Sequence, residues 1–150
     1  MEIMQRVSLD SQILLKEFLA QEQIAVLSLP INSKGKLHSA ALLYYHTESP
    51  LAFYFVTGRK TEKVRLLLES DSLPASCVIG MAKGIAFTIQ MRGEIRIAEL
   101  DTQTEAALYV KRGNRKDDLV DPDNICLQFT PSWVRFTDYP NGRERKMLEL

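Results

Sequence analysis

Short apolar runs separated by turn residues make up most of this chain, and this pattern limits the folds that are open to it. Seven runs are typical of β-strands, at 24–29, 37–45, 51–56, 75–79, 85–100, 125–129 and 133–136. Strands at this spacing, without a regular helical crossover between them, favour a barrel over a doubly wound parallel sheet. We therefore predict a mainly β (α+β) fold, a closed or partly closed antiparallel barrel of six to seven strands.

The turns between the runs suggest how the strands are connected. A polar loop with a glycine, at 32–36, joins the first two runs as a hairpin, and a turn at 47–50 leads to the third. We expect these three runs to lie side by side as an antiparallel meander. Gly93, inside the run 85–100, marks a bulge or a close approach to the backbone. Pro131 divides the runs 125–129 and 133–136, and a turn at 139–142 leads to a last run at 146–150.

Three stretches have helical rather than strand-like spacing. Apolar residues recur at helical intervals in 8–23, which has Ser and Asp residues at its start as potential caps and is predicted to be an amphipathic opening helix. A short helix begins at Thr61, and a third covers 102–112. The segment 113–124 that follows is rich in Asp, Asn, Lys and Arg, so we expect a surface loop there.

Length and charge fit one domain without a polyanionic partner. The 150 residues suffice for a single core, and no repeat, low-complexity tract or linker divides them, so we treat 1–150 as one domain. Lys and Arg total 19, and Asp and Glu also total 19, so the formal net charge is zero. Without a global field, any charged partner must be met by a local cluster of residues. This disfavours a dedicated nucleic-acid binder.

No stretch has the pattern of a secretory signal or a membrane span. Residues 1–10 carry charge, and nowhere do 18 apolar residues follow one another. We therefore expect a cytoplasmic protein with no membrane partner. Cys77 and Cys126 lie far apart without a CxxC pattern, and both are predicted to be small buried hydrophobic residues.

Most other side chains that could carry chemistry have a simpler role in packing. His38 and His46, eight residues apart, match no zinc pattern, so no metal site is predicted. The GxSxG, HExxH and GxGxxG motifs are absent. Trp133 is expected in packing or at an interface. Four further aromatic residues are expected to pack the barrel, namely Tyr44, Tyr45, Phe53 and Phe55.

The most informative local feature is a group of basic residues, which we call the basic cluster, at 59–65. It holds four basic residues and one acid at the start of a predicted helix, where the partial positive charge of the helix prefers anions. Basic side chains at a helix start are unfavourable by themselves, and a bound anion would reverse this effect. The hydroxyls of Thr57 and Thr61 would then join the cations of the cluster, and free backbone N–H groups, in a phosphate cradle. Arg59 and Lys63 would supply those cations.

The alternative is a solvated turn whose lysines face water. The segment lacks the GxxxxGK[ST] spacing of a nucleoside-triphosphate loop, so a triphosphate is not the expected ligand.

The order of the elements, taken with the basic cluster, resembles the FMN-binding split-barrel proteins related to pyridoxamine 5'-phosphate oxidase over roughly 12–138. The most specific part is 53–57 followed by 59–64, which is similar to the family's aromatic strand, its Thr and its Ser/Thr-x-Lys helix start. The segment 87–95 is similar to the family's long strand with a glycine in mid-course. The segment 133–138 resembles the closing strand of a small subgroup. The resemblance implies a split β-barrel with short flanking helices.

The resemblance also implies a homodimer that holds FMN at the subunit interface, with two sites per dimer. Thr61 and Lys63 would hold the phosphate, with Arg59 as a weaker candidate. Thr57 would lie beneath the ribityl chain or the ring. The strand formed by His38, Ser39, Ala40 and Ala41 would offer backbone groups to the isoalloxazine edge. Thr88 and Gln90 would approach from the partner subunit.

Three departures from the oxidase bear on function. The oxidase's C-terminal Arg-x-His substrate motif is absent from 139–145, which argues against oxidation of pyridoxamine phosphate. Glu62 stands where the family often has Arg, which would weaken the phosphate site or shift the preference toward FAD. Relatives also bind deazaflavin or haem, and haem ranks low here because neither histidine has an obvious axial position.

The leading hypothesis is a flavin-dependent oxidoreductase, in which NAD(P)H or a partner reduces FMN and a small unidentified substrate takes the electrons. No side chain is assigned as a catalytic acid or base. The first alternative is a flavin-binding carrier or redox sensor without turnover. The second is a cofactor-free barrel that binds a protein or an oligonucleotide through the basic cluster, and the neutral overall charge disfavours it.

Overall fold

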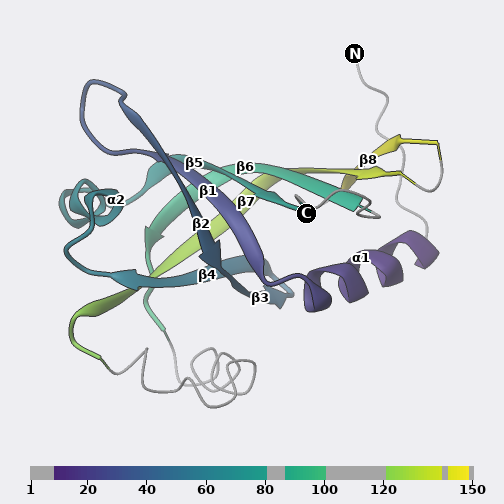
Figure 1. Ribbon diagram of the computed structural model, residues 1–150, viewed down its shortest axis with the longest axis horizontal. Helices are drawn as coiled ribbons and strands as arrows, with labels where there is room; N and C mark the ends of the chain where they lie inside the picture. The colour runs from purple at the N-terminus through teal and green to yellow at the C-terminus, as the bar shows by residue number, and fades with distance from the viewer. Residues whose placement is uncertain (1–8, 81–86, 101–120, 140–141, 149–150) are drawn as a thin grey trace.

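The computed structural model describes residues 9–80, 87–100, 121–139 and 142–148 (Figure 1). The predicted helix at 102–112 and most of the predicted loop at 113–124 lie outside these residues. The helices are α1 (Leu9–Gln21), α2 (Glu62–Arg65) and the 3-10 helix η1 (Leu67–Glu69). The strands are β1 (Ile24–Pro30), β2 (Leu37–Leu43), β3 (Tyr45–Glu48), β4 (Leu51–Gly58), β5 (Leu73–Ile79), β6 (Phe87–Ile97), β7 (Asn124–Asp138) and β8 (Glu144–Leu148).

The strands form one antiparallel sheet that curls into a partly closed barrel. Seven of them follow one another in the order β2-β1-β5-β6-β7-β4-β3, and β8 pairs with β7 beside this path. The sheet curls back on itself, because β2, at one end of the path, contacts β4, which is next to the other end, and the two cross in Figure 1. The predicted fold class is confirmed. The run at the end of the chain adds β8 to the seven strands of the path.

The expected meander of the first three strand-like runs is wrong. The run 37–45 is broken at Tyr44, so that β2 and β3 stand at opposite ends of the sheet path and β4 pairs with β7 instead. Tyr44 fixes this break through two hydrogen bonds to the end of α1 and the residues after it. Its backbone N–H donates to the Gln23 carbonyl at 3.0 Å, and its hydroxyl donates to the Leu19 carbonyl at 2.6 Å. Burial raises the pKa of this hydroxyl, so it stays a donor.

A bulge couples the two longest strands. Arg92 of β6 faces Trp133 of β7, but Gly93 faces Pro131, so one extra residue sits on β7 at this point. A Cβ atom on Gly93 would lie 2.1 Å from the Thr130 carbonyl oxygen, which explains the glycine predicted to mark a bulge or close approach. The sequence predicts two separate strands here, one on each side of Pro131. They form a single strand of 15 residues, because a proline at a bulge need not donate to the ladder.

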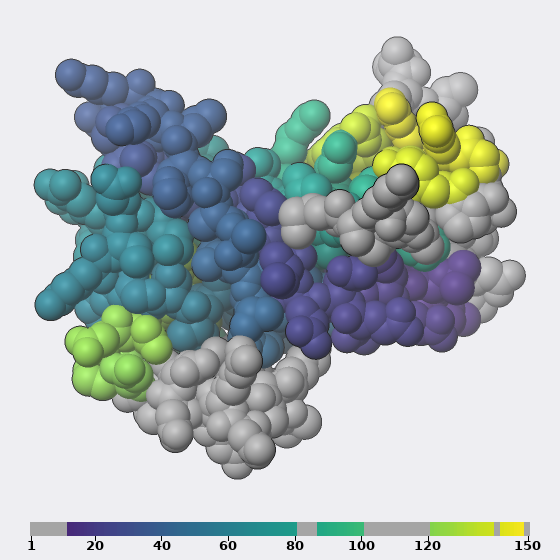
Figure 2. Space-filling view, in the orientation of Figure 1, coloured from purple at the N-terminus to yellow at the C-terminus, as the bar shows by residue number. Residues whose placement is uncertain are grey.

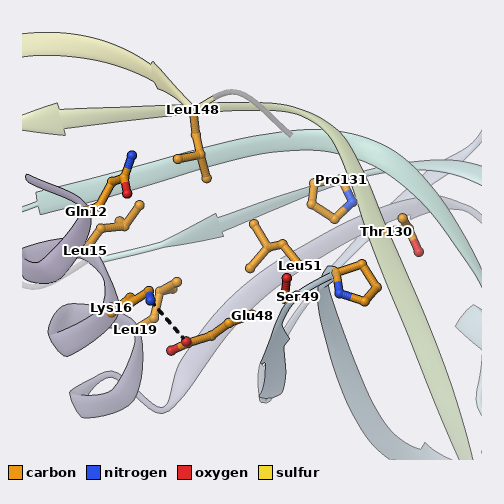
Figure 3. Close-up of a pocket in the computed structure, with 11 residues that line it drawn as sticks. Gln12, Leu15, Lys16, Leu19, Glu48, Ser49, Leu51, Thr130, Pro131 and Leu148 are labelled. Atoms are coloured by element: carbon orange, nitrogen blue, oxygen red, sulfur yellow. Dashed lines mark ion pairs between the residues drawn. The ribbon is translucent and has the colours of Figure 1, made fainter. Parts of the chain in front are cut away.

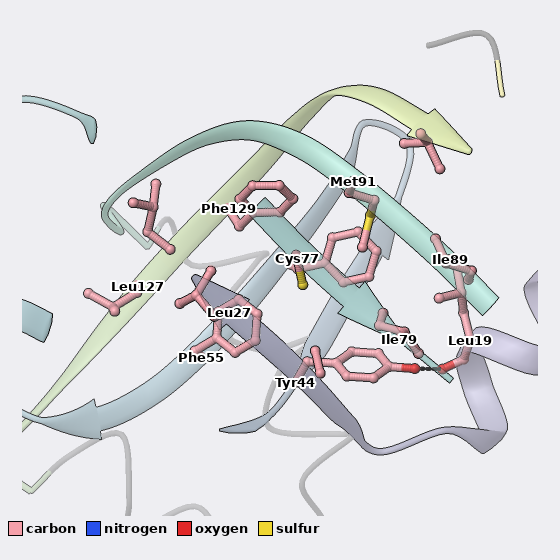
Figure 4. Close-up of a cluster of buried hydrophobic side chains, with 14 of the residues drawn as sticks. Leu19, Leu27, Tyr44, Phe55, Cys77, Ile79, Ile89, Met91, Leu127 and Phe129 are labelled. Carbon is pink, nitrogen blue, oxygen red and sulfur yellow. Dashed lines mark hydrogen bonds between the residues drawn. The ribbon is translucent and has the colours of Figure 1, made fainter. Parts of the chain in front are cut away.

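The core lies on the inner face of the curled sheet, and α1 packs against one side of it (Figure 4). Strands contribute the largest fully buried side chains, among them Leu27, Phe53, Phe55, Ile89, Met91, Phe129 and Phe136. The helix α1 adds Leu15, Phe18 and Leu19. The predicted packing roles of Tyr44, Phe53 and Phe55 are confirmed.

Cys77 is also buried in this core, as predicted, and burial raises the pKa of its thiol to about 12. Cys126 is half-buried on the other face of the sheet, beside Ala52 and Tyr54. Within the described residues, no helix has the length and apolar character needed to span a membrane.

Candidate functional site

The basic cluster lies in the connection from β4 to α2. Phe53, Phe55 and Thr57 alternate along β4 toward the inside of the barrel, so the Thr57 side chain is buried at the end of the core row. The chain then turns through 59–61 and enters α2, whose buried residues are Lys63 and Val64. The sequence therefore folds so that one hydroxyl and one lysine of the predicted phosphate cradle are both buried at this corner.

Thr61 holds the turn together. Its backbone N–H and its hydroxyl both donate to the Gly58 carbonyl, at 3.3 and 2.9 Å, and its own carbonyl accepts from the Val64 N–H at 3.2 Å. Thr61 stands at the N-cap position of α2 in an extended conformation, but its side chain does not cap the helix. To donate to a phosphate, the hydroxyl would have to give up its bond to Gly58.

The side chain of Lys63 is largely buried and has no described counter-charge. It is 8% exposed, and its removal from water lowers its pKa from the usual 10.5. In the described part of the chain, no carboxylate forms an ion pair with it. Because a buried charge is costly unless an opposite charge accompanies it, a phosphate at this corner would offset that cost. Lys63 at this corner, unpaired among the described residues, is therefore suited to a phosphate group.

Arg59 points elsewhere. Its backbone N–H donates to the Asp123 carbonyl at 2.8 Å, while Nε and Nη2 of its guanidinium donate to the carbonyls of Pro122 and Asn124, each at 3.3 Å. These bonds fasten the end of β4 to the start of β7. Arg59 is thus partly committed to a structural role, in keeping with its rank as the weaker phosphate candidate.

The predicted ring-edge residues lie along β2. In the described sheet this strand pairs along one side, with β1, and its side chains alternate between the two faces. His38 and Ala40 are half-buried on one face, while Ser39 and Ala41 are exposed on the other. The hydroxyl of Ser39 lies 2.6 Å from that of Ser28 on β1. Contact between β2 and β4 brings this strand to the side of the barrel that carries the basic cluster.

Thr88 and Gln90 lie on the outer face of β6. They alternate with the buried side chains of Ile89 and Met91, so they point away from the core. Thr57 points into it. A single copy of the chain therefore does not present these residues on the sheet face that holds Thr57.

Comparison with protein-family models and with curated proteins gave no match. Solved structures do match. A protein of Clostridium acetobutylicum related to general stress protein 26 of B. subtilis (pyridoxinephosphate oxidase family) superposes with a TM-score of 0.65 at 15% identity, over 96% of this chain and 97% of its own. General stress protein 26 of Bacillus anthracis gives 0.63 at 18% identity, over 89% and 95%. HutZ, the heme storage protein of Vibrio cholerae, gives 0.63 at 14% identity, over 81% and 89%.

The chain is a split barrel. The resemblance predicted from the sequence is confirmed at the level of the fold, and at such low identities it extends to the fold alone. In this split barrel, the β4–α2 corner carries Thr57, Thr61 and Lys63, whereas Thr88 and Gln90 stand on the opposite sheet face.

Sequence reasoning missed a polar patch on the outer face of this split barrel. Arg135 of β7 donates through Nη2 to the side-chain oxygen of Gln90. The guanidinium of Arg92 lies 4.1 Å from the ring centre of Trp133, and that of Arg135 lies 5.4 Å away. The alternation of polar and apolar residues along 89–92 could have placed Gln90 and Arg92 on one face. The pairing with β7 could not have been found, because it depends on the register across the bulge.

The histidines of the split barrel differ in their surroundings. His46 is buried in β3, where its ring stacks on Phe53 with the centres 6.0 Å apart and also lies near Tyr44. Its packing gives it a structural role. His38 is half-buried on β2. In the described part of the chain, no three or more His, Cys, Asp or Glu residues come together as a metal site.

Proposed function

We propose that this protein is a flavoprotein that binds FMN at the β4–α2 corner and uses it as an oxidoreductase on a small substrate. The single observation that carries the proposal is Lys63, a lysine that is only 8% exposed and has no described carboxylate partner. A phosphate dianion is a suitable counter-charge for it. The fold supports the proposal, since a structural neighbour is described as a member of the pyridoxinephosphate oxidase family.

In this proposal Lys63 and Thr61 hold the phosphate of FMN, and Thr57 lies beside the ribityl chain. Arg59 keeps the corner attached to the start of β7 through its two bonds to carbonyl oxygens. When it is bound, FMN supplies hydride or electron transfer, so the protein need only position the ring and control access to it. The same corner would accept FAD if the site stays open beyond the phosphate.

We also propose that the flavin site is completed by a second copy of the chain. Large apolar side chains are exposed on the outer face of the β1–β2 pair, where Ile24 is 43% exposed, Leu43 is 38% exposed and Leu37 is 71% exposed. The register sets Ile24 opposite Leu43. The surface of β2 faces the viewer in Figure 2. Leu37 lies at the other end of β2 on the same face, and exposed apolar side chains along one sheet face are typical of a surface that a partner covers.

The phosphate role of Lys63 is tested by a matched pair of variants. Lys63→Ala should weaken FMN binding roughly ten- to hundred-fold, because it removes a charge-assisted hydrogen bond worth about 1.5 to 3 kcal/mol. Lys60→Ala, which removes an exposed lysine of the same cluster, should change the affinity by less than about threefold. Quenching of flavin fluorescence measures both, and circular dichroism checks that both variants fold. Equal affinities in wild type and Lys63→Ala would contradict the proposal, as would a protein that neither carries nor takes up flavin.

Turnover is tested separately from binding. The FMN complex is mixed with NADH or NADPH in the absence of oxygen, and the visible flavin absorption is followed. Bleaching supports an oxidoreductase that uses NAD(P)H. An unchanged spectrum favours the flavin carrier or sensor, or reduction by a protein partner.

Haem is the second candidate cofactor, because HutZ, a heme storage protein, has the same fold. Addition of hemin to the protein distinguishes the two, since a sharp haem absorption band together with absence of flavin uptake would favour haem.

A further inference from the structure

A pocket of about 510 Å³ (Figure 3) lies beside α1, which is on the other side of the molecule from α2 in Figure 1. We call it the α1 pocket. It forms where α1, the turn between β3 and β4, the bulged part of β7 and the end of β8 meet. None of its lining residues belongs to the β4–α2 corner.

The floor of the α1 pocket is apolar. It is formed by Leu15 and Leu19 of α1, Leu51 of β4, Pro131 of β7 and Leu148 of β8, whose side chains converge from separate elements in Figure 3. Apolar hollows of about 150 Å³ in proteins stay dry and bind molecules the size of benzene. At about 510 Å³, the α1 pocket falls within the roughly 300 to 1,000 Å³ that are typical of small-molecule sites.

The rim of the α1 pocket is polar but carries no net charge. Lys16 of α1 and Glu48 of β3 form an ion pair across it, with Nζ and Oε2 3.6 Å apart (Figure 3). Gln12, Ser49 and Thr130 add uncharged groups that form hydrogen bonds. An anionic ligand would meet Glu48 and a cationic one Lys16, so the rim favours neither sign of charge.

We propose that the α1 pocket is a binding site for a small uncharged amphiphile, whose aliphatic or aromatic body lies on the leucine floor and whose single hydrogen-bonding group stays at the rim. The floor supplies the affinity by removing apolar surface from water, and the rim selects against charged molecules. This site does not depend on the flavin site, so the two proposals can fail separately.

The test uses N-phenyl-1-naphthylamine, an uncharged fluorescent amphiphile with one N–H donor. It should bind with saturation at one site per chain, with a dissociation constant on the order of 0.1 mM or tighter. Gln12→Trp and Leu148→Trp place an indole in the pocket from two sides, and each should weaken binding about tenfold or more. Leu14→Trp is the matched control, since Leu14 lies on α1, is 44% exposed and does not line the pocket. It should leave the affinity within about twofold.

Competition with FMN separates the α1 pocket from the flavin site. Saturating FMN should leave probe binding unchanged, whereas displacement by FMN would put the probe in the flavin site and overturn the proposal. The anionic relative 1-anilinonaphthalene-8-sulfonate should bind about tenfold more weakly. Circular dichroism verifies the fold of each variant, and Ser49→Trp, in the exposed turn, replaces either pocket variant that does not fold. Absence of saturable binding of N-phenyl-1-naphthylamine, undiminished binding to both pocket variants, or preference for the anion would each overturn it.

Discussion

At the scale of single residues, burial separates side chains that look alike in the sequence. Lys60 and Lys63 stand three positions apart in the basic cluster, yet Lys60 is exposed and Lys63 is buried next to Val64. Charge pattern alone leaves a solvated turn and a phosphate cradle both open. Burial of the Lys63 side chain favours the cradle, because in a solvated turn this side chain would extend into water as that of Lys60 does.

The lowered pKa of Lys63 predicts how FMN affinity depends on pH. As pH rises through this lowered pKa, the ammonium group loses its proton. The affinity for FMN should therefore begin to fall at a lower pH than it would for an ordinary lysine, whose pKa is 10.5. Lys63→Arg stays protonated and should bind FMN without this alkaline fall. Flavin fluorescence titrations between about pH 7 and 10 measure the dependence, with Lys60→Arg as the control. An alkaline fall that is identical in wild type and Lys63→Arg would show that another group titrates.

At the scale of elements, local patterns are read correctly from the sequence, but long-range pairing is not. Gly93 is predicted as a bulge or close approach from its place in an apolar run, and the structure confirms it. The sequence wrongly predicts that Pro131, which faces Gly93 across the sheet, divides two strands. A proline is tolerated inside a strand where the hydrogen bonding between strands is already interrupted, and the bulge provides such a place. The meander fails because β4 pairs with β7, a segment about 70 residues later, and the turn at Tyr44 that permits this depends on tertiary hydrogen bonds.

The bulge predicts a large cost for a single methyl group. In Gly93→Ala, the new Cβ would lie 2.1 Å from the Thr130 carbonyl oxygen and 2.8 Å from the Pro131 Cα, both backbone atoms, so β6 and β7 would have to separate. We expect a loss of stability of about 1 to 3 kcal/mol or more. Gly58→Ala is the control, because its Cβ would meet a side-chain methyl group at 3.4 Å. Urea unfolding measures both, and a Gly93→Ala variant as stable as Gly58→Ala would refute the close packing of the two strands.

At the scale of the whole molecule, the curled sheet has an inner face filled by its core and an outer face that a single copy leaves partly uncovered. Alternation along each strand predicts which residues share a face, but only the register shows that apolar side chains of β1 and β2 meet on the outside. The same logic applies to the candidate site. The sequence identifies the corner that holds Lys63, whereas the outer patch of Gln90, Trp133 and Arg135 emerges only once β6 and β7 are paired.

The exposed apolar face predicts that two copies associate and that flavin binding depends on their association. Leu37→Glu combined with Leu43→Glu puts two carboxylates on this face, where burying them against a second copy would be costly, so the dimer should dissociate at micromolar concentrations. FMN affinity should fall with it, because Thr88 and Gln90 of one copy could no longer reach the cofactor held by the other.

Analytical ultracentrifugation with and without FMN measures this association, and Leu14→Glu, on the exposed side of α1, should remain a dimer. A wild-type protein that is monomeric yet binds FMN tightly would mean that one copy suffices, and the outer face of β6 would then have no part in the site. A double variant that stays dimeric would instead place the subunit contact on a different surface, because carboxylates buried in an interface are costly without a matching positive charge.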